Sequence, residues 1–221
     1  MSSEPLAIYM GREAARTIGE QGWQADHFDL LLGASGGPKW LILSQLDRVL
    51  FGGFLAAGTR PLAVLGSSIG SWRHACLGTR DPVAALARME SHYLDQAYGE
   101  KPSPAEVSAV SLHILEQVLG ATGTAEILQN PRIHPHIVTA RGRGLAASTA
   151  TAPLATGMGT AALGNALSRE LLKLHFQRVV FHSGATPAQQ LIADDFQTVA
   201  CPLTADNLAA ALHASGAIPF V

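Results

Sequence analysis

The clearest chemical pattern in the sequence is formed by Gly66, Ser68 and Gly70, which match the G-x-S-x-G pattern of a nucleophile elbow. An apolar run of strand length, residues 62–65, precedes them, and a stretch expected to be helical follows from Ile69. At such a turn the serine is held in a strained backbone position, and the glycines prevent collisions across the turn. We therefore predict Ser68 as a nucleophile. The alternative is an ordinary glycine-serine turn between a buried strand and a helix.

A second glycine-containing loop follows another apolar run at residues 30–32, and Gly36, Gly37 and Pro38 lead from it into an expected helix. In a parallel sheet the loops that follow the strands collect at one edge. We therefore expect the backbone N–H groups of Gly36 and Gly37 to face Ser68 and to stabilise an oxyanion. A phosphate-binding P-loop is excluded, because it needs glycine before its lysine and Ser or Thr after it.

A histidine and an acid could complete a local triad, because the α/β-hydrolase order is serine, acid, histidine. His213 allows this order, since it follows the acids Asp194, Asp195 and Asp206. A histidine in the last expected helix is more often a core or surface residue, so the triad is disfavoured. His74 lies six residues beyond Ser68 on one expected helix and points to another face, which makes it a poor base.

Other polar and thiol groups give weaker signals. His134 and His136 have no third ligand at metal-binding spacing, so we expect no metal and no cofactor. The stretch at residues 141–144, Arg-Gly-Arg-Gly, could contact an anionic head group but is more typical of a solvated turn. We expect Cys76 and Cys201, which lie far apart in apolar surroundings, to be buried and reduced.

Together the two loops resemble the patatin-like phospholipase (patatin-like acyl hydrolase) family. Residues 36–39, Gly-Gly-Pro-Lys, match its early Gly-Gly-x-Arg/Lys loop, and residues 66–70 match its later elbow. Residues 214–219 are similar to its Ala-Ser-x-Ala-x-Pro segment, so the resemblance covers about residues 30–73 and 203–221. It implies a serine lipid acyl hydrolase, of phospholipase or esterase type, that forms an acyl-enzyme on Ser68. Lys39 would support the oxyanion loop.

One departure from the family concerns the catalytic partner, an aspartate in an Asp-Gly-Gly or Asp-Gly-Ala motif after the third segment. No Asp-Gly pair occurs in this sequence, which ends at Val221. We expect the aspartate to lie beyond Val221 and the chain to be truncated at its C-terminal end. The alternatives are a catalytically silent relative that binds lipid or a partner, and an unrelated α/β domain that holds a phosphate.

Composition limits the remaining choices. The 221 residues are 48% hydrophobic and 14% charged, which suits a single domain spanning residues 1–221 with a sizeable core. The net charge is −2 and the sequence has no Lys/Arg run, so it gives no indication of a basic surface that would bind nucleic acid or an anionic membrane. Sparse charge suits a lipid or small ester substrate and transient contact with a membrane surface. Because we find neither a signal peptide nor an 18-residue apolar run, we expect a cytoplasmic protein. The sequence does not determine its oligomeric state.

The pattern of elements predicts an α/β fold, a three-layer α/β/α sandwich with a mostly parallel central sheet and a helical insertion in mid-chain. We expect strands at residues 28–32, 61–65, 134–140, 179–181 and 199–203.

Expected helices cover residues 6–22, 38–51, 69–77, 82–98, 104–118, 125–129 and 208–213, and another ends near His175. We expect Gly52 and Gly53 to interrupt the chain after the helix at residues 38–51, and residues 146–164 to form a mobile loop. Asp81 and Thr204 are the expected N-caps of two helices, and Ser103 with Glu106 forms a capping box.

Overall fold

The computed structural model of the chain describes residues 7–184, 187–193 and 195–220. Within them, five strands form one sheet in chain order: β1 (Leu30–Gly33), β2 (Leu62–Ser67), β3 (Ile133–Gly142), β4 (Phe176–His182) and β5 (Thr198–Pro202). Neighbouring strands are parallel except β3 and β4, which are antiparallel. The prediction of an α/β architecture with a mostly parallel sheet is therefore confirmed.

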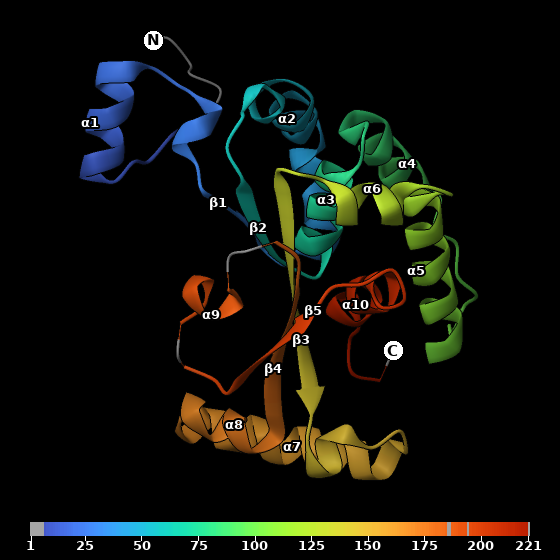
Figure 1. The fold of residues 1–221 in the computed structure, drawn as a ribbon. Coiled ribbons are helices and arrows are strands. Elements are labelled where there is room, and N and C mark those ends of the chain that lie inside the picture. The colour runs from blue at the N-terminus through green and yellow to red at the C-terminus, as the bar shows by residue number, and fades with distance from the viewer. Residues whose placement is uncertain (1–6, 185–186, 194, 221) are drawn as a thin grey trace.

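Helices follow most of the strands. They are α1 (Arg12–Gln21), α2 (Ser44–Val49), α3 (Ile69–Gly78), α4 (Pro82–Leu94), α5 (Pro104–Leu119), α6 (Gly123–Gln129), α7 (Thr151–Leu167), α8 (Leu172–His175), α9 (Ala188–Leu191) and α10 (Leu208–Gly216). Figure 1 shows α2 to α6 and α10 gathered on one side of the sheet, α1 and α9 on the other, and α7 and α8 at one end. The expected helical insertion in mid-chain is present as α4 to α6.

Helix α3 is the centre of the core. Nine of its ten residues are buried, including Trp72 and Cys76. Strand β2, which precedes it, is buried on both faces, with Leu62 and Val64 on one face and Ala63 on the other, as expected of an inner strand in a parallel set. Because α3 is enclosed on nearly all sides, its polar residues are also inside, and Arg73 is paired with the buried Asp47. The elbow that joins β2 to α3 therefore lies on a rigid base.

The predicted helix caps are confirmed for two of the three helices. Asp81 accepts a hydrogen bond from Ala84 N–H (2.9 Å), and Ser103 Oγ accepts one from Glu106 N–H (3.1 Å). The second half of the capping box is wrong, because Glu106 Oε1 accepts from the N–H of Gly99 (2.9 Å). Thr204 is not the N-cap of α10. That position belongs to the residue three further along, Asn207.

Other element boundaries differ from the predictions. Helix α1 begins at Arg12, residues 7–11 are not helical, and Leu6 lies outside the described residues. Gly52 and Gly53 do not interrupt the chain, because they lie within a continuous helical stretch that leads from α2 to Ala57. Most of residues 146–164 are helical instead of forming a loop, since alanine favours the helix strongly enough to offset the glycines of α7.

Among the described residues, one helical stretch, Gly37–Ala57, is long and apolar enough to cross a membrane by length and composition alone. The sequence analysis expected no such run. This test is weak evidence, because core helices of globular proteins also pass it. Trp40, Phe51 and Leu55 of this stretch are packed into the hydrophobic core.

Candidate active site

Ser68 occupies the turn between β2 and α3 with φ 55° and ψ −132°, a region that side-chain-bearing residues rarely adopt. Both flanking glycines are sterically required. A Cβ on Gly66 would lie 2.6 Å from the Cα of Ser71, and one on Gly70 would lie 2.2 Å from the carbonyl oxygen of Gly33. The turn therefore has the backbone geometry of a nucleophile elbow, with β1 and α3 in direct backbone contact beneath it.

Hydrogen bonds fix the backbone of Ser68 on both sides. Its carbonyl oxygen accepts from Ser71 N–H (2.9 Å) and Ser71 Oγ–H (2.6 Å). Its N–H donates to Ser215 Oγ (2.8 Å), which in turn donates to the carbonyl oxygen of Val138 on β3 (2.6 Å). The elbow is thus held in place by α10 and β3, while the Ser68 hydroxyl itself makes no hydrogen bond among the described residues.

The first glycine loop lies beside the elbow, as the sequence predicted. Strands β1 and β2 are paired so that Gly33 is opposite Gly66. Ser35 Oγ–H reaches across to Ser67 Oγ (3.1 Å) and joins the two loops. Gly37 has φ 51°, and within the described chain neither its N–H nor that of Gly36 donates a backbone hydrogen bond. These two N–H groups are therefore available to a ligand.

Ser68 and Gly37 both line a cavity of about 210 Å³. Its walls come from α3, α4, α5, the segment after α4, and the end of α10. The lining combines hydroxyl, amide and imidazole groups with apolar side chains: Ile69, Trp72, Tyr93, Gln96, Tyr98, Val107, Ser108, Ser111, Ile114, His213 and Ile218. The cavity therefore places one nucleophile and one oxyanion-loop glycine beside several hydrogen-bonding groups.

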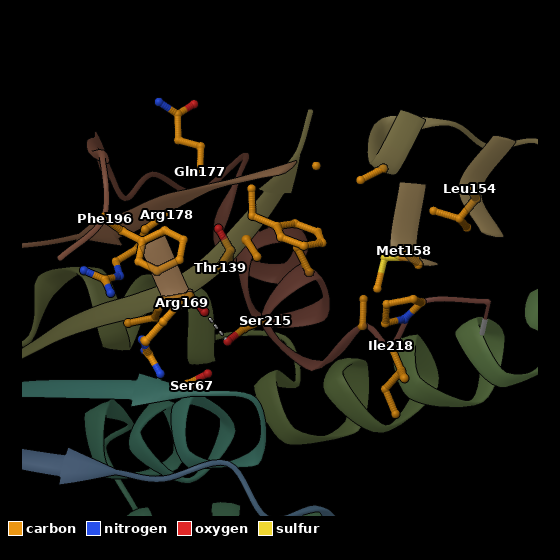
Figure 2. A pocket seen from close by; sticks show the side chains of 18 residues that line it. Ser67, Thr139, Leu154, Met158, Arg169, Gln177, Arg178, Phe196, Ser215 and Ile218 are labelled. Atoms are coloured by element: carbon orange, nitrogen blue, oxygen red, sulfur yellow. Dashed lines mark hydrogen bonds between the residues drawn. The ribbon is translucent and has the colours of Figure 1, made fainter. Parts of the chain in front are cut away.

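A larger cavity of about 560 Å³ lies on the other side of the segment that follows α10 (Figure 2). It is lined by Ser67 and not by Ser68, and most of its wall is apolar, with Leu154 and Met158 of α7 on one side. Arg178 at the opposite side donates to Asp195 (2.8 Å) and lies over the ring of Phe196. Its guanidinium is therefore committed to structural contacts.

Most of the other predicted site residues do not line the cavity that contains Ser68. Gly36 and Lys39 do not line the Ser68 cavity, and the Lys39 side chain is exposed. His213 does line it, but no acid from the predicted triad accompanies it. Asp195 is bonded to Arg178 at the larger cavity, and Asp206 precedes the start of α10, whereas His213 is near its end. Asp194 lies outside the described residues.

His74 is buried beneath the elbow and is not a base for Ser68. Its burial, together with the neighbouring charge of Arg73, lowers the pKa of the imidazole to about 3. The ring lies against β1, so that a Cβ on Gly33 would come within 2.7 Å of its Cε1 atom. His74 therefore supports the close approach of β1 and α3 as a neutral side chain.

The histidines of β3 and β4 pack against one another. No cluster of three or more His, Cys, Asp or Glu side chains suited to a metal occurs in the part of the chain that the structure describes. His136 stacks on His182 across β3 and β4, with ring centroids 5.6 Å apart. Burial is the main cause that lowers the pKa of both His134 and His182. These rings therefore belong to the packing of the sheet.

The arginine-glycine stretch and the cysteines also have structural surroundings. Arg143 donates to the carbonyl oxygen of Lys173 (3.4 Å) and to the side chain of Gln197, so it ties the end of β3 to α8. Cys76 is buried, and burial raises the pKa of its thiol to about 12. Cys201 is half-buried, which corrects the prediction that both thiols are fully buried.

Comparisons with models of protein families, with curated proteins and with solved structures found no match. Function must therefore be inferred from the geometry of the elbow and from the resemblance of its motifs.

The sequence analysis assigned no contact to several residues that define this site. Ser215 lies in residues 214–219, the segment that resembles Ala-Ser-x-Ala-x-Pro. Its hydrogen bond from the Ser68 N–H joins positions that are 147 residues apart. Ser108 and Ser111 lie on α5 with no local motif around them. Their spacing of three residues places them on one face of the helix, and this is the single local signal that could have grouped them.

Proposed function

We propose that the protein is a serine acyl hydrolase that cleaves carboxylic esters, of the phospholipase or esterase type, through an acyl-enzyme on Ser68. The observation that carries this proposal is the backbone of Ser68, held at φ 55° between two glycines that cannot carry a Cβ. Strain of this kind is retained where the surrounding structure enforces it, and it is concentrated at functional sites. An ordinary turn between a strand and a helix does not require it.

In the proposed reaction, Ser68 Oγ attacks the ester carbonyl carbon as its proton passes to a base. The carbonyl oxygen becomes an oxyanion, which the N–H of Gly37 at the cavity wall stabilises by roughly 2.7–4 kcal/mol. The second donor of the proposal is the adjacent N–H of Gly36, which would have to turn toward the cavity. Collapse of this intermediate releases the alcohol, which takes up the proton, and leaves the acyl group on Ser68. Water then attacks the acyl-enzyme and releases the acid.

The base is the part of the proposal that the resemblance to patatin-like hydrolases supplies. That resemblance implies a three-layer patatin-like sandwich, a Ser-Asp dyad and a lipid or small ester as substrate. Transient contact with a membrane surface and a cytoplasmic location are proposed from the composition and the N-terminal sequence. No carboxylate among the described residues lines the Ser68 cavity, where His213 is the group able to accept a proton. The variant His213→Ala distinguishes His213 from the implied aspartate as the base. We expect its ester turnover to stay within about threefold of the wild-type rate, because no acid orients the His213 imidazole.

A second candidate function is a catalytically silent domain of the same type that binds lipid or a partner. The absence of a carboxylate from the described lining of the Ser68 cavity favours it. Under this alternative the elbow geometry persists without turnover, so binding and hydrolysis must be measured separately.

The experiment that tests the proposed function compares two neighbouring serines. Hydrolysis of p-nitrophenyl butanoate and of a phospholipid is measured for the wild type, Ser68→Ala and Ser67→Ala. We expect Ser68→Ala to lose turnover by about 10³-fold or more, because the nucleophile is removed, and Ser67→Ala to retain most of it. Equal rates for Ser68→Ala and the wild type would refute the assignment of Ser68.

A further inference from the structure

The two cavities at the elbow differ in size and in the residues that line them, and only the smaller one contains Ser68. We infer that Ser68 acts on esters of a short acyl group that carries hydrogen-bonding substituents, and not on long-chain lipid esters. This inference rests on the proposed function and specifies its substrate class. The chemistry is the ester hydrolysis described above, with water as the second reactant.

The volume of the Ser68 cavity limits the acyl group. Its 210 Å³ lies below the range of about 300–1,000 Å³ that is typical of sites for drug-sized molecules. We therefore expect an acyl group of about four carbons with one or two substituents to fill this cavity better than an extended chain of twelve carbons.

The polar groups of the cavity favour a substituted acyl group over a plain alkyl chain. The side chains of Tyr93, Ser108, Ser111 and His213 line the cavity and make no side-chain hydrogen bond to the described part of the chain. A plain alkyl chain that displaced water from these groups would leave them without partners, which costs free energy. A hydroxyl on the substrate would satisfy one or two of them.

Part of the polar wall is already ordered. Tyr98 O–H donates to Gln96 Oε1 (2.6 Å), and Gln96 Nε2 donates to the carbonyl oxygen of Tyr93 (2.6 Å). These bonds fix the segment after α4 at the margin of the cavity. The Tyr93 ring also packs edge-on against Trp40. The hydroxyl of Tyr93 therefore has a defined position before any substrate enters.

The larger apolar cavity does not provide a route for a long chain from Ser68. Ala217 and Ile218 line both cavities and form the wall between them. The bond from Ser68 N–H to Ser215 Oγ closes the same boundary next to the elbow. The apolar volume that would suit a lipid tail is therefore on the side of Ser67, separated from the nucleophile.

A chain-length series tests this inference. The specificity constants kcat/KM are measured for p-nitrophenyl esters of 3-hydroxybutanoate, butanoate and dodecanoate, the last below its aggregation concentration. We expect butanoate to exceed dodecanoate by about 100-fold, and 3-hydroxybutanoate to exceed butanoate by about tenfold, because binding sites with unpaired polar groups discriminate strongly for a matching hydroxyl.

Ser111→Ala assigns the preference to the cavity, because alanine removes the hydroxyl and adds no bulk to the cavity. We expect it to lower the ratio of the hydroxybutanoate to the butanoate constant by about threefold or more, since one hydrogen-bond partner is removed. Ser91→Ala is the matched control. Ser91 is an exposed helical serine that lies outside the cavity and bonds to Asp95, so the ratio should not change.

The outcomes separate the two proposals. Reaction of Ser68 with a fluorophosphonate, detected as an adduct by intact-mass spectrometry, would support the proposed function. If this adduct forms and dodecanoate is turned over as fast as butanoate or faster, the inference is overturned and the proposed function stays intact. An unchanged ratio in Ser111→Ala would also overturn it. Failure of every ester, with no phosphonylation of Ser68, would remove the proposed function and this inference with it.

Discussion

Ser67 and Ser68 are adjacent in the sequence but belong to two different regions of the molecule. Ser67 is the last residue of β2, its hydroxyl accepts a hydrogen bond from Ser35, and it lines the large apolar cavity. Ser68 has a positive φ and no hydrogen bond to its hydroxyl among the described residues, and it lines the smaller cavity, whose wall combines hydroxyl and imidazole groups with apolar side chains. The two serines therefore differ in backbone conformation and surroundings and not in residue type, and under the proposed function this difference decides which of them reacts.

The same comparison explains why the elbow needs such close packing. Ser67 requires only the ordinary extended backbone of a strand. Ser68 requires a strained conformation, which persists because Gly70 lies against Gly33 and because Ser215 accepts the Ser68 N–H. Changes that loosen these contacts should affect Ser68 and leave the environment of Ser67 largely intact.

The largest effect on stability is expected from Gly70→Ala. The added methyl would lie 2.2 Å from the carbonyl oxygen of Gly33, which is backbone and cannot rotate away. We expect the free energy of unfolding to fall by about 3 kcal/mol, measured by urea denaturation.

Gly53→Ala is the matched control for Gly70→Ala, since it lies in a helical stretch where a Cβ would meet no atom within 4 Å. We expect a gain of up to about 1 kcal/mol there. Equal destabilisation by the two substitutions would contradict the close approach of α3 and β1.

The next effect concerns pH. The pKa of His74 is lowered to about 3, so from about pH 6.5 downward the unfolded chain binds a proton that the folded chain excludes. Stability is therefore present above pH 6.5 and falls as the pH decreases toward 3. Between pH 7 and pH 5 this group removes about 2 kcal/mol. His74→Phe should flatten the pH dependence of the unfolding free energy by this amount.

If His74→Phe gives the same slope as the wild type, His74 is not a buried neutral side chain.

The smallest effect on stability is expected from Ser215→Ala. This change removes the acceptor of the Ser68 N–H and the donor to Val138, which should cost about 1–2 kcal/mol. Because the hydrogen bond positions the elbow, the rate of Ser68 phosphonylation should fall more than the stability change alone would cause. A normal rate in a destabilised protein would show that Ser215 has only a structural role.

The elbow could be predicted from the sequence because its requirements are local: two glycines at fixed spacing around a serine, between a strand and a helix. The parallel pairing of β1 and β2 follows from the same local pattern. The antiparallel direction of β4 could not be predicted, because it depends on how α7 and α8 return the chain to the edge of the sheet where β3 ends.

The surroundings of Ser68 were not predictable for a related reason. The cavity combines Gly37, Tyr93, Ser111 and His213, which come from four separate elements with no shared motif. The composition of α7, rich in alanine and glycine, allowed both a loop and a helix. Its packing against residues 144–147, where a Cβ on Gly157 would meet the backbone of Ala146 at 2.4 Å, is consistent only with the helix.

The central claim, that Ser68 and not Ser67 is the activated nucleophile, is tested most directly by intact-mass spectrometry after reaction with a fluorophosphonate. We predict one adduct on the wild type and on Ser67→Ala, and none on Ser68→Ala. An adduct that persists in Ser68→Ala and disappears in Ser67→Ala would contradict the claim. So would a wild-type protein that forms no adduct, which would instead identify the chain as catalytically silent.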